Sequence, residues 1–156
     1  MSRSLIAFGA NLSNPKASFL SAEVLLGEAG VTLTAKSGLW GSPAWPAGSG
    51  QPDYVNAVAS SRFTGAAEGL LDILQSVETA LGRVRSVRNA ARTLDLDLLT
   101  FDREVRATDQ LTLPHPRMLD RAFVLLPLCE IDTNWLKHLR KLPSSDVEAM
   151  TYLGQW

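Results

Sequence analysis

The chain has 156 residues, of which 46% are hydrophobic, and its 15 lysines and arginines nearly balance its 16 aspartates and glutamates. These totals are typical of one globular domain, so we expect residues 1–156 to form a single domain. The only cysteine, Cys129, excludes an internal disulfide. The net charge of −1 argues against a general nucleic-acid binder, which needs a basic excess to displace counterions from phosphates.

Apolar segments are short throughout the chain. The N-terminal run is too short for a signal peptide, and the longest run elsewhere is AFVLLPLC at 122–129. A membrane-spanning helix needs about 20 apolar residues, so we expect a cytoplasmic protein with no membrane partner.

The first part of the chain alternates strands with one helix. Residues 3–8 predict a strand, and Asn14 followed by Pro15 predicts the cap and first residue of a helix that runs to about residue 27 or 30. Residues 31–37 alternate as a second strand. The face of that strand that we expect to be apolar consists of Val31, Leu33 and Ala35.

A long loop separates this strand from the next elements. Residues 40–52 are rich in glycine, serine and proline and also carry two tryptophans, a combination that favours a functional loop. Residues 53–63 predict a third strand. Residues 66–81 repeat apolar side chains at helical spacing, and Gly82 is placed to end that helix.

The remaining elements follow a cluster of arginines. An arginine-rich loop leads into an alternating strand at 92–101, and a short hairpin is predicted around 105–113. The segment PHPRMLDRAFVLLPLCEI predicts a helix that ends at Pro127, because proline removes a backbone donor.

The order of these elements is β-α-β-β-α-β followed by helical additions. This order matches the ferredoxin-like α+β arrangement, in which two helices cover one face of an antiparallel sheet. We therefore expect the opposite face to be left for loops and ligand.

The strand at 92–101 carries two carboxylates on one face. Side chains alternate along a strand, so Asp95 and Asp97 point one way while the leucines between them point the other. Two carboxylates this close repel unless a cation lies between them, and Mg²⁺ is commonly held by one or two carboxylates together with substrate phosphates. Two such ions can clamp a phosphoryl group.

The arginines before this strand supply complementary chemistry, since guanidinium groups bind phosphate oxygens in a forked geometry. Each signal alone is more often a solvated sheet face or a surface salt-bridge partner. Together, within fifteen residues, they favour a site for nucleotide phosphates and Mg²⁺. The arginines are Arg83, Arg85, Arg88 and Arg92.

The segment RNAARTLDLDLL at 88–99 closely resembles the signature of the 6-hydroxymethyl-7,8-dihydropterin pyrophosphokinase family. The resemblance extends in order over about residues 5–131 and includes GANLSNP, QPDYVNAV, ETALGRVR and LPHPRMLDRAFVLLPLCEI. The tail from about Thr133 onward adds little to it. The resemblance implies a folate-pathway enzyme that transfers diphosphate from ATP to a pterin alcohol, with AMP as the other product.

The resemblance also implies roles at the phosphate end. Asp95 and Asp97 would bind two Mg²⁺ ions, and Arg83 and Arg92 would contact the transferred phosphates. The remaining residues implied to touch or lie near the nucleotide are Glu78, Arg85, Arg88, His115 and Arg121. Without the resemblance, His115 would be read as a capped turn residue, and Glu78 as a surface or salt-bridge residue.

For the pterin, the resemblance implies a ring that stacks on an aromatic side chain and is recognised by a carboxamide through a paired donor and acceptor. The implied residues are Ser42, Pro43, Tyr54, Asn56 and Phe123. On residue type alone Tyr54 and Phe123 would be core aromatics. Asn89 stands where the family is often aromatic, and the arginine loop is one residue shorter, so we expect Trp45 to supply the missing aromatic lid.

Two other classes of function stay open on the sequence. A ferredoxin-like sheet can bind single-stranded RNA, although Asp95 and Asp97 would repel its backbone. A catalytically silent nucleotide-binding relative is the other alternative. We expect a monomer whose partners are small molecules and not nucleic acid.

Overall fold

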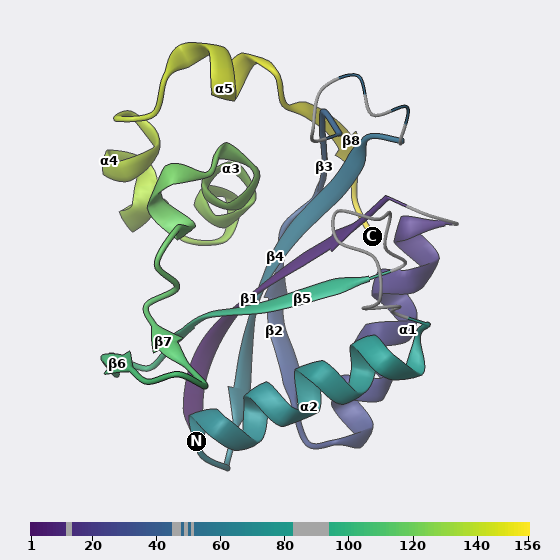
Figure 1. Cartoon of the computed structure of the whole chain (residues 1–156), viewed down its shortest axis with the longest axis vertical. Helices are drawn as coiled ribbons and strands as arrows, with labels where there is room; N and C mark the ends of the chain where they lie inside the picture. Colours follow the sequence, from purple (N-terminus) through teal and green to yellow (C-terminus); the bar gives the residue numbers. More distant parts are fainter. Residues whose placement is uncertain (12–13, 45–47, 49, 51, 83–93) are drawn as a thin grey trace.

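The computed structural model describes residues 1–11, 14–44, 48, 50, 52–82 and 94–156. Within these ranges it contains an antiparallel sheet and helices, as the sequence predicts (Figure 1). The first elements are β1 (Ser2–Ala10), α1 (Pro15–Glu28), β2 (Thr32–Lys36), β3 (Leu39–Ser42), β4 (Tyr54–Phe63) and α2 (Ala67–Ala80). They are followed by β5 (Asp95–Phe101), β6 (Arg106–Ala107), β7 (Thr112–Leu113), α3 (Ala122–Ile131), α4 (Leu136–Leu139), α5 (Ser144–Glu148) and β8 (Thr151–Gly154). Short 3₁₀ turns lie at Met118–Asp120 and Thr133–Trp135.

The described strands form one main sheet in the order β5-β1-β4-β3-β8. Strand β2 also pairs with β4, at residues 59–62, whereas β3 pairs with β4 at residues 54–56. Every pairing in this sheet is antiparallel. Strands β6 and β7 form the predicted hairpin. No helix in the described part of the chain is long and apolar enough to cross a membrane.

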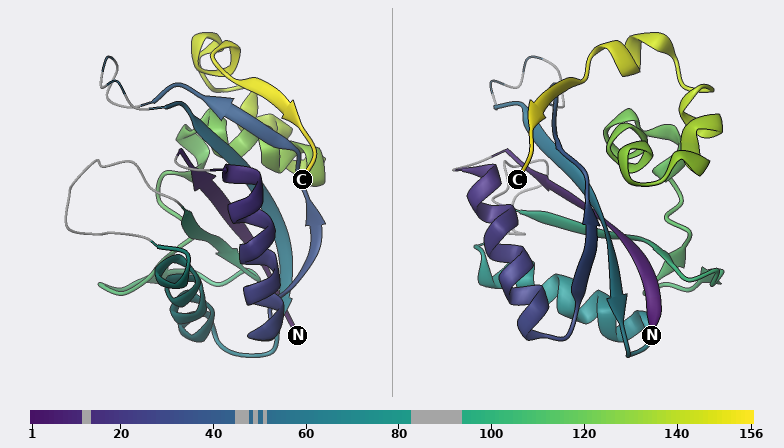
Figure 2. Two further views of the ribbon diagram at one scale, coloured as in Figure 1. Left: turned by 90° about the vertical axis from the view of Figure 1, so that its right-hand side faces the viewer. Right: turned by 180° about the vertical axis from the view of Figure 1, so that it is seen from behind.

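Helices α1 and α2 cover one face of the sheet (Figure 2). Asn14 caps α1 by accepting a hydrogen bond from the backbone N–H of Ala17, at 3.2 Å. The apolar side chains of α2 recur at helical spacing and bury Leu70, Leu74 and Val77 against the strands. Both helices therefore form where the sequence predicts them.

Helix α3 packs on the opposite face, part of which is therefore covered. Val124, Leu125 and Leu128 form a second buried cluster there with Val58 of β4. The prediction that this helix ends at Pro127 is wrong, because it continues to Ile131. Burial of the apolar residues after the proline outweighs the loss of one backbone donor.

The predicted loop at 40–52 begins with a strand. Residues 40–42 belong to β3, which pairs with β4 on one side and with β8 on the other. The partner strand β8 lies more than 100 residues away in sequence, so local composition carries no signal of this pairing.

The face predicted for residues 31–37 is also incorrect at one position. The register between β2 and β4 shifts between Leu33 and Ala35. The shift turns Ala35 out of alternation, and Ala35 is exposed while Val31 is buried.

The C-terminal segment is part of the packed structure. The indole ring of Trp156 lies 5.1 Å from the ring of Phe8 and 5.4 Å from that of Phe19, between centroids. Its Nε1 donates a hydrogen bond to the carbonyl oxygen of Ser37 at 2.8 Å. The end of the chain is thereby fixed beside the sheet.

Candidate active site

Strand β5 holds the acidic pair on the sheet face that carries α3. Leu96 and Leu98 are buried against α1 and α2, whereas Asp95 and Asp97 are half-buried and line a pocket on the other face. A register shift beside β1 at Leu5 and Ile6 then turns Phe101 back into the main core. The predicted alternation is thus confirmed from Asp95 to Leu98.

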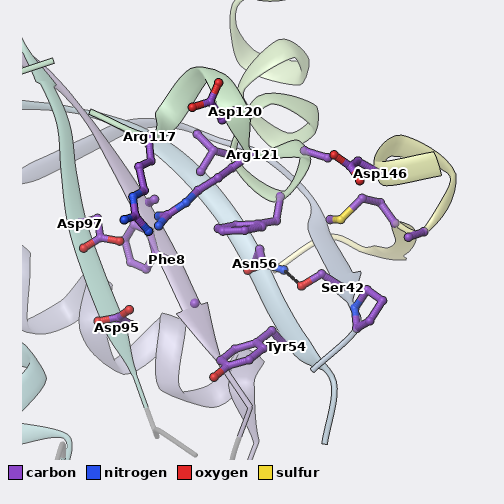
Figure 3. A pocket seen from close by; sticks show the side chains of 18 of the residues that line it. Phe8, Ser42, Tyr54, Asn56, Asp95, Asp97, Arg117, Asp120, Arg121 and Asp146 are labelled. Carbon is purple, nitrogen blue, oxygen red and sulfur yellow. Dashed lines mark hydrogen bonds between the residues drawn. The ribbon is translucent and has the colours of Figure 1, made fainter. Parts of the chain in front are cut away.

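The pocket has a volume of about 740 Å³ and lies between β1, β4, β5 and the start of α3. Figure 3 shows the side chains of Arg117 and Arg121 reaching from the α3 side toward Asp97. Two guanidinium groups and the acidic pair of β5 therefore share this end of the pocket, and Asp120 also lines the pocket. Such an end can bind a phosphate together with a cation.

His115 lies beside this charged end. Its backbone N–H donates to the carbonyl oxygen of Leu99 at 2.8 Å, which ties the turn to β5. Its Nδ1 accepts the backbone N–H of Arg117 at 3.2 Å, so in the neutral ring the proton is on Nε2. Burial lowers the pKa of His115, and the positive charges of Arg121 and Arg117 lower it further against a smaller opposing effect of Asp95. A neutral His115 can donate one hydrogen bond from Nε2.

The other end of the pocket carries an aromatic ring and an amide. Tyr54, Asn56 and Ser42 lie together where β3 and β4 pair, and Phe123 reaches the pocket from α3. The guanidinium carbon of Arg121 lies 5.3 Å from the centroid of the Phe123 ring, so Phe123 adjoins the charged end as well. Both aromatics are half-buried, in contrast to fully enclosed core residues.

The orientation of the Asn56 amide is fixed by two hydrogen bonds. Its Nδ2 donates to the carbonyl oxygen of Trp40 at 3.1 Å and to the Oγ of Ser42 at 2.9 Å, the second of which is drawn in Figure 3. Both amide hydrogens have protein partners, so Asn56 has its Oδ1 left to read a ligand. Our expectation of a paired donor and acceptor at Asn56 differs from this geometry.

Gly9 of β1 forms the floor between the two ends. It pairs with Asp95 on one side and with Asn56 on the other. Among the described residues, a Cβ at this position would meet only the Oδ1 of Asn56 within 4 Å, at 3.8 Å. The glycine thus leaves open space between the carboxylates and the amide.

Glu78 lies away from the pocket lining, on helix α2. It is 1% exposed, so it is not a surface residue, and its Oε2 accepts the backbone N–H of Leu96 at 2.8 Å. Leu96 stands between the two aspartates in sequence. Glu78 therefore satisfies a donor of the strand that carries Asp95 and Asp97.

Several predicted residues lie outside the described ranges. They are Trp45, Arg83, Arg85, Arg88, Asn89 and Arg92. Pro43, by contrast, is described and lines the pocket next to Ser42.

The donor set suits a hard cation that brings further ligands with it. Asp95 and Asp97 offer carboxylate oxygens from one strand face, and the described residues contain no group of three or more His, Cys, Asp or Glu side chains able to hold a metal ion. Mg²⁺ fits two carboxylates when substrate phosphates and water complete its shell.

Sequence reasoning did not predict several residues that line the pocket, among them Gly9, Arg117, Asp120, Asp146 and Met150. Arg117 lies in the same segment as His115 and Arg121, to which the resemblance assigns roles. Its position two residues after His115 could have identified it as a further arginine near the phosphates. Asp146 and Met150 belong to the C-terminal tail, and only the folded chain brings them to the pocket.

The fold and the pocket define an α+β protein with an antiparallel sheet and a cleft that is charged at one end and aromatic at the other, an arrangement able to bind a phosphorylated ligand beside a flat ring. The family described as 7,8-dihydro-6-hydroxymethylpterin-pyrophosphokinase (HPPK) matches residues 5–133. The chain belongs to this family.

Curated relatives agree with this assignment. The chain is 40% identical over 128 residues to 2-amino-4-hydroxy-6-hydroxymethyldihydropteridine pyrophosphokinase of Bacillus subtilis, covering 81% of this chain and 75% of that protein. It is 38% identical over 144 residues to the Haemophilus influenzae protein of the same name, covering 91% and 86%.

A solved structure titled as HPPK-DHPS in complex with substrates has the same fold. The TM-score is 0.63 at 12% sequence identity, and the match covers 84% of this chain and 42% of that chain. The chain therefore spans less than half of that longer protein.

Proposed function

We propose that this protein transfers diphosphate from ATP to the hydroxymethyl group of 6-hydroxymethyl-7,8-dihydropterin and releases AMP, as a step of folate biosynthesis. The observation that carries the proposal is one pocket that joins the acidic pair to the Tyr54–Asn56 end, in a chain of the pyrophosphokinase family. This assignment does not favour an RNA-binding module or a silent relative.

At the charged end, Asp95 and Asp97 would hold two Mg²⁺ ions. When bound, these ions would neutralise the negative charge of the phosphates. Arg121 and Arg117 line the pocket and would bind nucleotide phosphates. His115 lies beside them, outside the lining residues, and would bind a phosphate from there. Glu78 would act indirectly, because its hydrogen bond to the backbone of Leu96 holds β5 in place. We also propose that four further arginines bind phosphates, and that Arg83 and Arg92 contact the transferred diphosphate. The four are Arg83, Arg85, Arg88 and Arg92.

At the aromatic end, the pterin ring would lie between Tyr54 and Phe123. The Oδ1 of Asn56 would accept an N–H of the ring, and the backbone around Ser42 and Pro43 would complete its recognition. Trp45 would cover the ring as a lid.

In the reaction, the hydroxymethyl oxygen attacks the β-phosphorus of ATP. The bond from that phosphorus to the oxygen bridging the α- and β-phosphates breaks, AMP leaves with the bond's electron pair, and the hydroxyl proton passes to solvent. The protein contributes mainly by positioning both substrates and by stabilising charge with Arg117 and Arg121.

We also propose a ferredoxin-like core with C-terminal additions in a single domain of residues 1–156, acting as a monomer in the cytoplasm. Strand order β5-β1-β4-β2, with α1 and α2 on one face, supports the ferredoxin-like part.

The proposal is tested by incubating purified protein with ATP, Mg²⁺ and 6-hydroxymethyl-7,8-dihydropterin and separating AMP from ADP by chromatography. AMP that forms only with the pterin, and is lost in Asp97→Ala, supports diphosphate transfer. ATP binding without AMP would reject it in favour of a silent or retargeted relative.

A further inference from the structure

The C-terminal segment that follows α3 reaches the pocket although the family match ends at residue 133. Three of its residues, Asp146, Ala149 and Met150, line the pocket together with Ser42 and Asn56. They come from α5 and from the turn that joins α5 to β8. The segment therefore contributes a wall to a site otherwise built by the sheet and α3.

Strand register assigns this wall to the aromatic end of the pocket. Gly41 of β3 pairs with Thr151 of β8. Ser42 follows Gly41 and Met150 precedes Thr151, so in an antiparallel pair both residues come at the same end, and both line the pocket. Figure 3 agrees, because Asp146 lies on the Ser42 side, away from Asp95 and Asp97.

The segment is fixed at both ends, so its wall has a defined position. Beyond β8, Trp156 packs against Phe8 and Phe19, and before β8, α5 contacts α3. Within β8, the ring of Tyr152 lies 5.2 Å from that of Trp40 in an edge-to-face contact.

Trp40, which Tyr152 contacts, is also a hydrogen-bond partner of the Asn56 amide. The carbonyl oxygen of Trp40 accepts one of the two Asn56 hydrogens, which leaves Oδ1 as the acceptor toward the ligand. Asp146 adds a carboxylate, which is also an acceptor. The side chains of this end thus match the edge of a ring that carries N–H donors.

We propose that Asp146 and Met150 are ligand-binding residues at this end: Asp146 sets specificity by accepting a hydrogen bond from an amino group on the ring, and Met150 adds affinity by contacting the edge of the ring. The thioether of methionine is polarisable and adapts to a flat ring. The carboxylate of Asp146 also repels phosphate, which favours one orientation of the two substrates. This inference rests on the proposed function, because it takes the ring to be a pterin.

The test measures binding by isothermal titration calorimetry in the presence of Mg²⁺ and α,β-methylene-ATP, which cannot release AMP. The two ligands are 6-hydroxymethyl-7,8-dihydropterin and the matching dihydrolumazine, in which oxygen replaces the 2-amino group. The variants are Asp146→Ala, Met150→Ala and Met150→Leu, with Glu148→Ala as the control, because Glu148 is exposed on α5 and does not line the pocket.

We expect the wild type to bind the pterin at least about tenfold more tightly than the lumazine, since a hydrogen bond to a charged acceptor is lost in the latter. Asp146→Ala should reduce that preference to about threefold or less. Met150→Ala should weaken both ligands by the same factor, and Met150→Leu should restore binding. Glu148→Ala should bind both ligands as the wild type does.

Unchanged preference in Asp146→Ala would overturn the role of the carboxylate, and unchanged affinity in Met150→Ala would overturn the ring contact. A wild type that forms AMP from the pterin while both variants bind normally rejects this inference alone. A wild type that neither binds the pterin nor forms AMP rejects the proposed function, and this inference with it.

Discussion

Asp95 and Asn56 lie in the same row of the sheet, on either side of a residue that has no side chain. Each pairs with Gly9 of the central strand β1, so their α-carbons are separated by two strand spacings, roughly 10 Å. That span suits a flat ring at one end and a phosphate chain at the other. The open floor at Gly9 therefore connects the two halves of the pocket.

Gly9→Ala should reduce the rate of AMP formation by about tenfold or more while leaving stability almost unchanged. In the part of the chain that the structure describes, the new methyl group meets only the Oδ1 of Asn56, at 3.8 Å, an ordinary contact that the fold accommodates. The methyl group occupies the path of the ligand instead. Kinetics and urea unfolding check this. Gly27→Ala, on α1 with no described atom within 4 Å of the new Cβ, is the control for activity. Full activity in Gly9→Ala would show that the ligand does not cross this row.

Asp97→Asn should lower the rate of AMP formation by about 100-fold or more and raise the Mg²⁺ concentration that gives half of the maximal rate. The substitution keeps the size of the side chain and removes one negative charge from the pair, which weakens electrostatic stabilisation of the reacting phosphates. Steady-state assays over a Mg²⁺ titration measure both effects. Asp109→Asn, on the exposed hairpin, is the matched control and should behave as wild type. An unchanged Mg²⁺ dependence in Asp97→Asn would contradict the metal role.

Arg117→Ala should raise the KM for ATP by about tenfold, because a guanidinium that lines the charged end of the pocket is lost. Arg117→Lys should recover part of this loss, since it keeps the charge but not the fork. Steady-state kinetics at varied ATP concentration give the comparison. Arg103→Ala removes an exposed arginine outside the pocket and should have no effect. Equal KM values for both alanine variants would remove Arg117 from the site.

Glu78→Ala should lower the free energy of unfolding by about 1–3 kcal/mol, because it leaves the backbone N–H of Leu96 without its acceptor in a buried place. Urea denaturation measures the change. Glu78→Gln retains an acceptor oxygen and should lose less stability. If both variants lose the same amount, the hydrogen bond to Leu96 is not the cause.

His115 should make stability fall at acidic pH. Its pKa in the folded protein lies below the ordinary value near 6.5, owing first to burial and then to Arg121 and Arg117. The neutral ring is favoured in the fold, so this contribution is present above the unfolded pKa and is lost as pH falls through the lower folded value. Comparing wild type with His115→Gln by urea unfolding at pH 7.5 and pH 5 tests the sign. A difference between the two proteins that does not change with pH would contradict it.

Local periodicity was enough to predict much of the framework. The helix over Leu70 to Val77 and the alternation of leucine and aspartate in β5 follow from spacing, because each pattern presents one apolar face to a core. The helix after Asn14 follows from its cap signal instead. The same alternation predicted that Asp95 and Asp97 share a face.

The sequence by itself determined the elements of the β-α-β-β-α-β core, the acidic pair and the family, since these depend on local patterns and on ordered motifs. Only the tertiary structure decided that α3 continues past Pro127, that β8 pairs with β3, and that Met150 reaches the pocket. It also decided that Asn56 presents an acceptor, because Trp40 and Ser42 take both of its hydrogens. These features arise from contacts between residues distant in sequence, whose burial and hydrogen bonding no local pattern records.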